Sequence, residues 1–340
     1  MRVLLIGFGT VGQGVAEILL EKRDYLAKEK GMEFNVVGIF DKELGGVYRP
    51  QGINLEEALE TIHSGGNLTQ VHGESLDEDP SGFIQKAEAE VMVEMTYTDL
   101  KTAQPATSYI RAALDGNMHV VTTNKGPVAL NYKDLSIHAA ENGLEFLFEG
   151  TVMSGTPLIS VIQENLISSH IREVKGILNG TTNYILSRME EGLSYQKALE
   201  KSQELGYAEA QPEADVRGWD ALAKVSILAN VIFGANRKPF DYPCEGITEV
   251  SANDLIRVKD QGKRIKLIGK TWMEGNFVKA SVGPEEIDFT HPLAGVKGAF
   301  NALTITTEDV GEVTIVGPGA GQRESAYGVL RDLMAIGGKQ

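Results

Sequence analysis

The sequence is poor in cysteine and has no long apolar run. Cys244 is the single cysteine among 340 residues, which excludes an internal disulfide framework and any multi-cysteine metal site. A lone thiol of this kind is typical of a reducing compartment. No apolar run approaches the ~20 residues needed to span a bilayer, and the N-terminus lacks the small-residue cleavage pattern of a signal peptide. We therefore expect a cytoplasmic protein with no membrane partner.

Positive charge is also scarce. The chain has 32 Lys and Arg residues against 47 Asp and Glu residues, and its formal net charge is −15. This balance disfavours nucleic acid and anionic membranes as partners, because both carry negative charge. The sequence also lacks a P-loop, a G-x-S-x-G motif and a His-rich cluster. Its length allows two domains and a substantial core.

A glycine motif at the N-terminus predicts a dinucleotide site. The apolar run 3–6 has the pattern of a strand, and a helical pattern begins at Val15. G-x-G-x-x-G lies between them, where it predicts a tight turn, close backbone approach to a pyrophosphate and a helix N-terminus facing the anion. The predicted cofactor-binding residues of this segment are Gly7, Gly9, Thr10, Val11 and Gly12.

Asp41 follows the second predicted strand, residues 36–40. A carboxylate here accepts hydrogen bonds from the adenosine ribose hydroxyls and repels a 2′-phosphate, so it favours NAD over NADP. The spacing from Gly12 to Asp41 exceeds the usual ~20 residues, which predicts an inserted loop around residues 29–34. Lys42 and Arg49 lie close enough in sequence to pair with a phosphate. The alternative for Asp41 is an exposed turn residue.

Strands and helices alternate as far as residue 148. Such alternation predicts an α/β domain with a parallel, doubly wound sheet, in which ligands bind at the carboxyl ends of the strands. Thr96 and Lys125 follow the strands predicted at 91–95 and 120–122. Both are therefore candidate ligand contacts, although a lysine there also fits an ordinary surface position.

A polar, flexible loop follows the strand predicted at residues 144–148. It combines the Glu149 carboxylate with the segment that contains Val152, Ser154 and Thr156. Oxygen ligands of this kind suit a hard monovalent or divalent cation. From the residues alone, a simple turn from a strand into the helix predicted at 158–166 is the better explanation.

Residues 215–234 have helical periodicity, with an apolar stripe on one side and Gly234 at the position of a C-terminal cap. Asp220 and Lys224 are four residues apart and share a face centred on that stripe. The ordinary interpretation is an ion pair on a solvated face. Burial of both charges is costly, however, and a lysine beside a carboxylate at an apolar wall is typical of a proton-transfer group. Gly218 favours a close backbone approach there.

After residue 264 the pattern changes to short strands without long intervening helices. This change predicts a mixed or antiparallel sheet in a second, α+β domain. The expected strands are 266–272, 277–282, 302–307 and 312–316. Gly321 ends a glycine-rich turn before a helix predicted at 325–336, which favours an anion or cofactor contact, or only the start of a helix.

Six segments resemble, in order, the motifs of homoserine dehydrogenases. The similarity spans nearly the whole chain, and the long central motif is far more specific than the glycine motif. The segments are GFGTVG at 7–12, TTNKGP at 122–127, EGTVMSGTP at 149–157, LNGTTNYI at 178–185, GYAEAQPEADVRGWDALAK at 206–224 and GPGAG at 317–321. That family reduces aspartate 4-semialdehyde to L-homoserine with NAD(P)H, in threonine, methionine and isoleucine biosynthesis.

The resemblance implies roles for individual residues. Lys224 resembles the family's acid–base lysine, and Asp220 resembles its substrate-holding partner. Glu209 resembles the carboxylate that receives the substrate's amino group, and Lys125 matches a position beside the nicotinamide and substrate. Further implied substrate contacts are Asp215, Gly180 and Thr181, and further cofactor contacts are Thr96 and Gly321. A monovalent cation, often sodium, is implied at Glu149, Val152, Ser154 and Thr156.

The resemblance also implies an overall organisation. We expect a Rossmann-type nucleotide-binding domain at 1–130, completed by 310–340, and a substrate-binding domain at 131–309 whose sheet forms a homodimer. The chain stops at Gln340, without the C-terminal ACT domain of many relatives, so we expect no threonine feedback through such a domain. Two rival functions are another amino-acid dehydrogenase or reductase on the same nucleotide domain and a non-catalytic dinucleotide sensor. The former would lack the set of Glu209, Asp220 and Lys224, and the latter the pair of Asp220 and Lys224.

Overall fold

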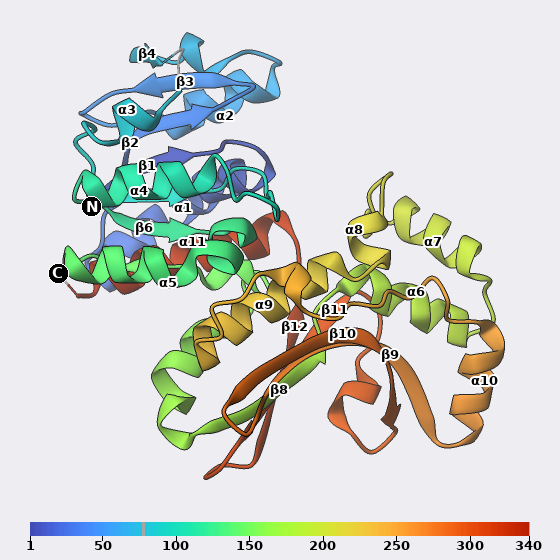
Figure 1. Ribbon diagram of the computed structural model, residues 1–340. Coiled ribbons are helices and arrows are strands. Elements are labelled where there is room, and N and C mark those ends of the chain that lie inside the picture. The colour runs from blue at the N-terminus through green and yellow to red at the C-terminus, as the bar shows by residue number, and fades with distance from the viewer. Residues whose placement is uncertain (77–78, 340) are drawn as a thin grey trace. The chain divides into compact units, whose positions relative to one another are not determined.

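The computed structural model describes residues 1–76 and 79–339. The chain divides into two compact units, and each is built around a sheet of its own (Figure 1). Unit 1 comprises Met1–Gly155 and Gly321–Gln340, and unit 2 comprises Thr156–Ala320. Within the described part of the chain, none of the helices combines the length and the apolar character that crossing a membrane requires.

The sheet of unit 1 has seven strands in the order β4-β3-β2-β1-β5-β6-β7. β1 pairs in parallel with β2 and β5, and β6 pairs in parallel with β5 and β7. β3 and β4 extend the β2 edge in antiparallel orientation. The predicted doubly wound sheet is thus confirmed, with an antiparallel edge. Its strands are β1 (Arg2–Ile6), β2 (Asn35–Asp41), β3 (Gly45–Tyr48), β4 (Glu74–Leu76), β5 (Val91–Glu94), β6 (His119–Thr122) and β7 (Phe146–Leu147).

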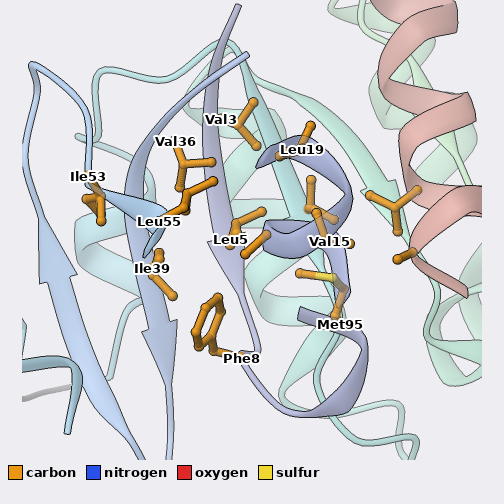
Figure 2. Close-up of a cluster of buried hydrophobic side chains, with 14 of the residues drawn as sticks. Val3, Leu5, Phe8, Val15, Leu19, Val36, Ile39, Ile53, Leu55 and Met95 are labelled. Atoms are coloured by element: carbon orange, nitrogen blue, oxygen red, sulfur yellow. The ribbon is translucent and has the colours of Figure 1, made fainter. Parts of the chain in front are cut away.

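The C-terminal helix belongs to the core of unit 1. Val329 and Leu333 of α11 (Gln322–Gly337) are buried in the same apolar cluster as Val15 and Leu19 of α1 (Thr10–Lys30). Figure 2 shows part of this cluster, where the side chains of β1, β2 and α1 meet. Removing this apolar surface from water holds the end of the chain on the first unit. The other helices of the unit are α2 (Leu55–His63), α3 (Ser81–Ile84), α4 (Ala106–Asp115) and α5 (Lys125–Glu141).

The sheet of unit 2 is antiparallel throughout, in the order β10-β9-β8-β11-β12. The α+β architecture predicted for this part of the chain is therefore confirmed. Helix α9 packs against β9 and β10. The strands are β8 (Ile171–Ile177), β9 (Lys263–Glu274), β10 (Phe277–Asp288), β11 (Phe300–Thr307) and β12 (Glu312–Pro318), and the helices are α6 (Gly180–Glu190), α7 (Tyr195–Glu204), α8 (Glu213–Val216), α9 (Trp219–Phe233) and α10 (Ala252–Asp260).

Both expected domain boundaries differ from the observed ones. The segment 131–155 lies in unit 1 rather than in the second domain, because it carries most of α5 and also β7, which pairs with β6. The segment 310–320 lies in unit 2, because β12 pairs with β11. Strand pairing therefore divides the two compact units at residues 155 and 320, not at the expected 130 and 310.

Three local predictions also need correction. The helix expected at 215–234 is broken at Gly218, whose φ of 81° separates α8 from α9. The loop expected around residues 29–34 is shorter than predicted and comprises residues 31–34, because α1 continues to Lys30. The acidic, turn-rich composition of residues 74–82 predicts a surface loop, but this segment contains β4 and the start of α3, and its residues 77–78 lie outside the described residues.

Candidate functional site

Lys224 and Asp220 form a buried ion pair on α9. The Lys224 Nζ donates to Asp220 Oδ2 at 2.7 Å and to the Leu178 carbonyl at 2.8 Å. The side chains are only 9% and 18% exposed, respectively. Because the pair is largely removed from water, the solvated-face interpretation is wrong for these two residues. Two of the three ammonium protons are used by these partners, and the third has no partner among the described residues.

Asn179 joins this pair to a second carboxylate. As the N-cap of α6, Asn179 accepts from the Thr182 amide through Oδ1. Its Nδ2 donates to Asp215 Oδ1 at 2.7 Å and to Asp220 Oδ2 at 3.0 Å. Burial is the main cause that raises the pKa of Asp215, and the negative charge of Asp220 raises it further. The structure thus brings together three predicted site residues through an asparagine that the site prediction omitted.

Thr181 ties the segment before α8 to the start of α6. Its hydroxyl donates to the Tyr207 carbonyl at 2.6 Å. Glu209, two residues further on, is exposed, so it is not packed into the cluster around Lys224 but remains accessible to a ligand from solvent. Gly180 is required by packing, because a Cβ there would lie 2.4 Å from the Ala299 carbonyl oxygen.

The glycine motif in unit 1 forms the expected tight turn. Gly7 has a φ of 96°, and a Cβ on Gly12 would lie 2.3 Å from the Gly7 carbonyl oxygen. Gly9 is the N-cap of α1 without a side-chain cap, and a Cβ there would meet no atom within 4 Å. Thr10 and Val11 form the first turn of α1. The turn therefore leaves backbone amides at a helix N-terminus accessible to an anion.

Asp41 lies directly beside this turn. Its Oδ2 accepts from the Phe8 amide at 2.8 Å, and its Oδ1 accepts from the Glu43 amide at 2.9 Å. These bonds fix the carboxylate at the end of β2, next to the glycine turn. Lys42 is exposed and Arg49 is half-buried. The geometry suits a ribose-binding carboxylate.

A fully buried carboxylate, Glu94, organises the carboxyl ends of β5 and β6. It accepts from the Thr96 amide at 2.8 Å, from the Thr96 hydroxyl and from the Thr122 hydroxyl at 2.8 Å. Burial raises its pKa. Asn124 donates to the carbonyls of Thr96 and Tyr97 and caps α5, whose first residue is Lys125. Glu94 was missed, although an acid ending the apolar run VMVE could have signalled it.

The predicted cation loop is anchored by α11. Glu149 is buried, its carboxylate lies 3.5 Å from the Arg331 guanidinium, and its amide donates to Asp332 Oδ2 at 2.9 Å. Burial is the main cause that raises the pKa of Asp332 to about 7. The Ser154 hydroxyl bonds to Ser325. Within residues 1–76 and 79–339, no group of three His, Cys, Asp or Glu side chains could hold a metal ion.

The remaining predicted residues of these loops have structural contacts of their own. In unit 2, the Thr156 hydroxyl donates to the Pro318 carbonyl at 3.0 Å. In unit 1, Val152 is buried, and Gly321 is the N-cap of α11 with a φ of 139°. The side-chain oxygens of Ser154 and Thr156 are thus both engaged in hydrogen bonds within the protein.

Known proteins share this architecture over its full length. The family model for homoserine dehydrogenase matches residues 157–334, and that for the NAD-binding domain of homoserine dehydrogenase matches residues 7–149. An NAD(+)-dependent homoserine dehydrogenase from Pseudomonas canavaninivorans is 39% identical, covering 98% of this chain and 96% of the relative. A homoserine dehydrogenase from Methanocaldococcus jannaschii is 38% identical, covering 99% of this chain and 98% of the relative. The solved structure of a hyperthermophilic archaeal homoserine dehydrogenase in complex with NADPH has a TM-score of 0.85 at 32% identity. The match covers 100% of this chain and 98% of that chain.

Proposed function

The chain belongs to the homoserine dehydrogenase family and has that family's NAD-binding domain, and from this premise we propose how its residues interconvert L-homoserine and aspartate 4-semialdehyde. The protein is an oxidoreductase. NAD(P), when bound, supplies or accepts the hydride. The residues proposed to hold it are Gly7, Gly9, Thr10, Val11, Gly12, Asp41, Thr96, Lys125 and Gly321 in unit 1.

Lys224 is the proposed acid–base group. In the direction of aldehyde reduction, negative charge develops on the carbonyl oxygen, and the Lys224 ammonium donates a proton there. Asp220 and the Leu178 carbonyl hold the Nζ in place through bonds of 2.7 and 2.8 Å. The single observation that supports this role is the burial of this ion pair at the start of α9 with one ammonium proton left for a ligand.

The activity itself is tested by following the absorbance of the reduced cofactor. We expect turnover with L-homoserine and NAD(P), and much slower turnover with amino alcohols of other lengths. An equal rate with a different amino alcohol would favour another amino-acid dehydrogenase. Cofactor binding without any turnover would favour a dinucleotide sensor.

Glu209 is the proposed partner of the substrate's ammonium group, because it is an exposed carboxylate on the segment that Thr181 ties to α6. Replacing it with alanine removes a charge-assisted hydrogen bond worth about 1.5–3 kcal/mol. We expect kcat/KM for homoserine to fall about 10- to 100-fold, with NAD(H) affinity unchanged. Glu213→Ala is the matched control, since Glu213 is also exposed. Equal effects of the two substitutions would reject the assignment.

Asp41 supports the use of NAD(H) at least as well as NADP(H), since its carboxylate is fixed beside the glycine turn. Asp41→Asn retains an acceptor for the Phe8 amide but removes the charge. Repulsion between a carboxylate and a phosphate a few ångströms apart is worth about 1–4 kcal/mol, so we expect the substitution to raise the kcat/KM ratio of NADPH to NADH about tenfold or more. Glu43→Gln, on the same turn, should leave the ratio unchanged. A hundredfold preference of the unaltered protein for NADP(H) would contradict the proposal.

A monovalent cation is the proposed ligand of the loop with Glu149, Val152, Ser154 and Thr156. The loop offers one buried carboxylate, whose charge Arg331 already balances in part. This donor set fits a singly charged ion held mainly by backbone carbonyls rather than a divalent ion. We expect turnover or thermal stability to rise with sodium chloride more than with choline chloride at equal ionic strength. Identical curves in the two salts would exclude a role for the cation.

We further propose a homodimer that forms through the sheet of unit 2. Large apolar side chains of its strands are exposed, among them Phe277, Phe300 and Val316, and exposed apolar groups on a sheet favour association. Sedimentation equilibrium should therefore give twice the mass of the chain. The cytoplasm remains the compartment expected from the sequence.

A further inference from the structure

Asn301 is a fully buried polar residue that the proposed mechanism does not use. It lies in β11, and its Nδ2 donates to the Leu178 carbonyl at 3.0 Å. The same carbonyl accepts from the Lys224 Nζ at 2.8 Å. A carbonyl oxygen has two lone pairs, so the amide and the ammonium share one acceptor. Asn301 is therefore connected to Lys224 through a single backbone atom.

The side-chain oxygen of Asn301 destabilises the fold. Its Oδ1 is buried and has no hydrogen-bond partner among the described residues. The residue is also tightly enclosed, because a Cβ on Gly319 would lie 2.1 Å from the Asn301 Cγ. A buried acceptor without a partner costs stability, whereas leucine has nearly the same shape and no such cost. Positions where a local rule of folding is broken are expected at functional sites.

We propose that Asn301 is a positioning residue for Lys224. Its amide fixes the direction of the Leu178 carbonyl, and this carbonyl with Asp220 fixes the Nζ, so that the third ammonium proton points to the ligand. The inference rests on the proposed acid–base role of Lys224. It assigns to Asn301 an effect on the chemical step and no stabilising role.

Asn301→Leu separates these two effects. We expect kcat to fall by about 10- to 100-fold, since small displacements of a catalytic group have costs of this order. The Tm should stay unchanged or rise, and KM for homoserine and Kd for NADH should not change. Thr304→Val is the matched control: Thr304 is a fully buried residue of the same strand whose hydroxyl bonds to Thr314. It should leave kcat unchanged.

Asn301→Asp provides a second test that does not depend on the folding of the leucine variant. A protonated carboxyl group can still donate to Leu178, whereas the ionised form cannot and would instead attract the Lys224 ammonium. We therefore expect kcat relative to the unaltered protein to recover as the pH is lowered. A ratio independent of pH, or normal kcat in Asn301→Leu, overturns the inference. So does a fall in kcat that merely follows a fall in Tm.

Failure of this inference can be distinguished from failure of the proposed function. If Lys224→Ala retains near-normal turnover, the acid–base role itself is wrong. If Lys224→Ala loses turnover while Asn301→Leu keeps it, only the role of Asn301 is rejected. A solvent deuterium isotope effect on kcat that increases in Asn301→Leu would support slower proton transfer specifically.

Discussion

Replacing Lys224 with alanine is expected to lower kcat by about 10²–10⁴, the usual contribution of a positioned acid–base group. NADH affinity should change little, because Lys224 is not among the residues proposed to hold the cofactor. Single-turnover rates together with NADH titration measure both quantities. Lys224→Arg should not restore kcat, because a guanidinium stays protonated and cannot act as a base.

A structural role for Lys224 gives a different result. If the ion pair only stabilises the fold, Lys224→Ala leaves the Asp220 carboxylate buried with Asn179 as a donor, and the free energy of unfolding falls while turnover of the folded protein persists. Thermal melting of the same variant distinguishes the catalytic role of Lys224 from the structural one. A folded variant with near-normal single-turnover rates would defeat the catalytic assignment.

Asp220→Ala should have the largest effect on stability. It leaves the Lys224 ammonium, 9% exposed in the intact protein, with the Leu178 carbonyl as its remaining partner. Breaking a buried pair in this way costs about 3–5 kcal/mol, which corresponds to a fall in Tm on the order of 10 °C. Kcat should fall as well, because the Nζ loses one of its two anchors.

The matched control is an exposed pair with the same spacing. Asp24 and Lys28 are also four residues apart on a helix, but their side chains are 86% and 73% exposed. Asp24→Ala should cost less than about 0.5 kcal/mol, since water and salt screen such pairs. If Asp220→Ala lowers the Tm no more than Asp24→Ala does, burial does not strengthen the pair. That result would exclude a stabilising role for the Asp220–Lys224 pair.

The sequence by itself determined the features that depend on short-range patterns. The glycine motif between strand and helix predicted the turn at Gly7 and Gly12, because positive φ and close backbone contacts require glycine. The alternation of strands and helices predicted the parallel sheet, and helical spacing placed Asp220 and Lys224 on one face. Each of these signals lies within a few residues or within one element, where local geometry determines the structure.

Only the tertiary structure decided which distant groups meet. Asn179 lies 36 residues from Asp215 and 41 from Asp220, and Asn301 lies 123 residues from Leu178; no local pattern encodes such pairs. The break at Gly218 was hidden because apolar periodicity continues on both sides of it. The domain boundaries shifted for the same reason: β7 and β12 are assigned by the strands with which they pair, and pairing depends on the folded chain rather than on neighbouring residues.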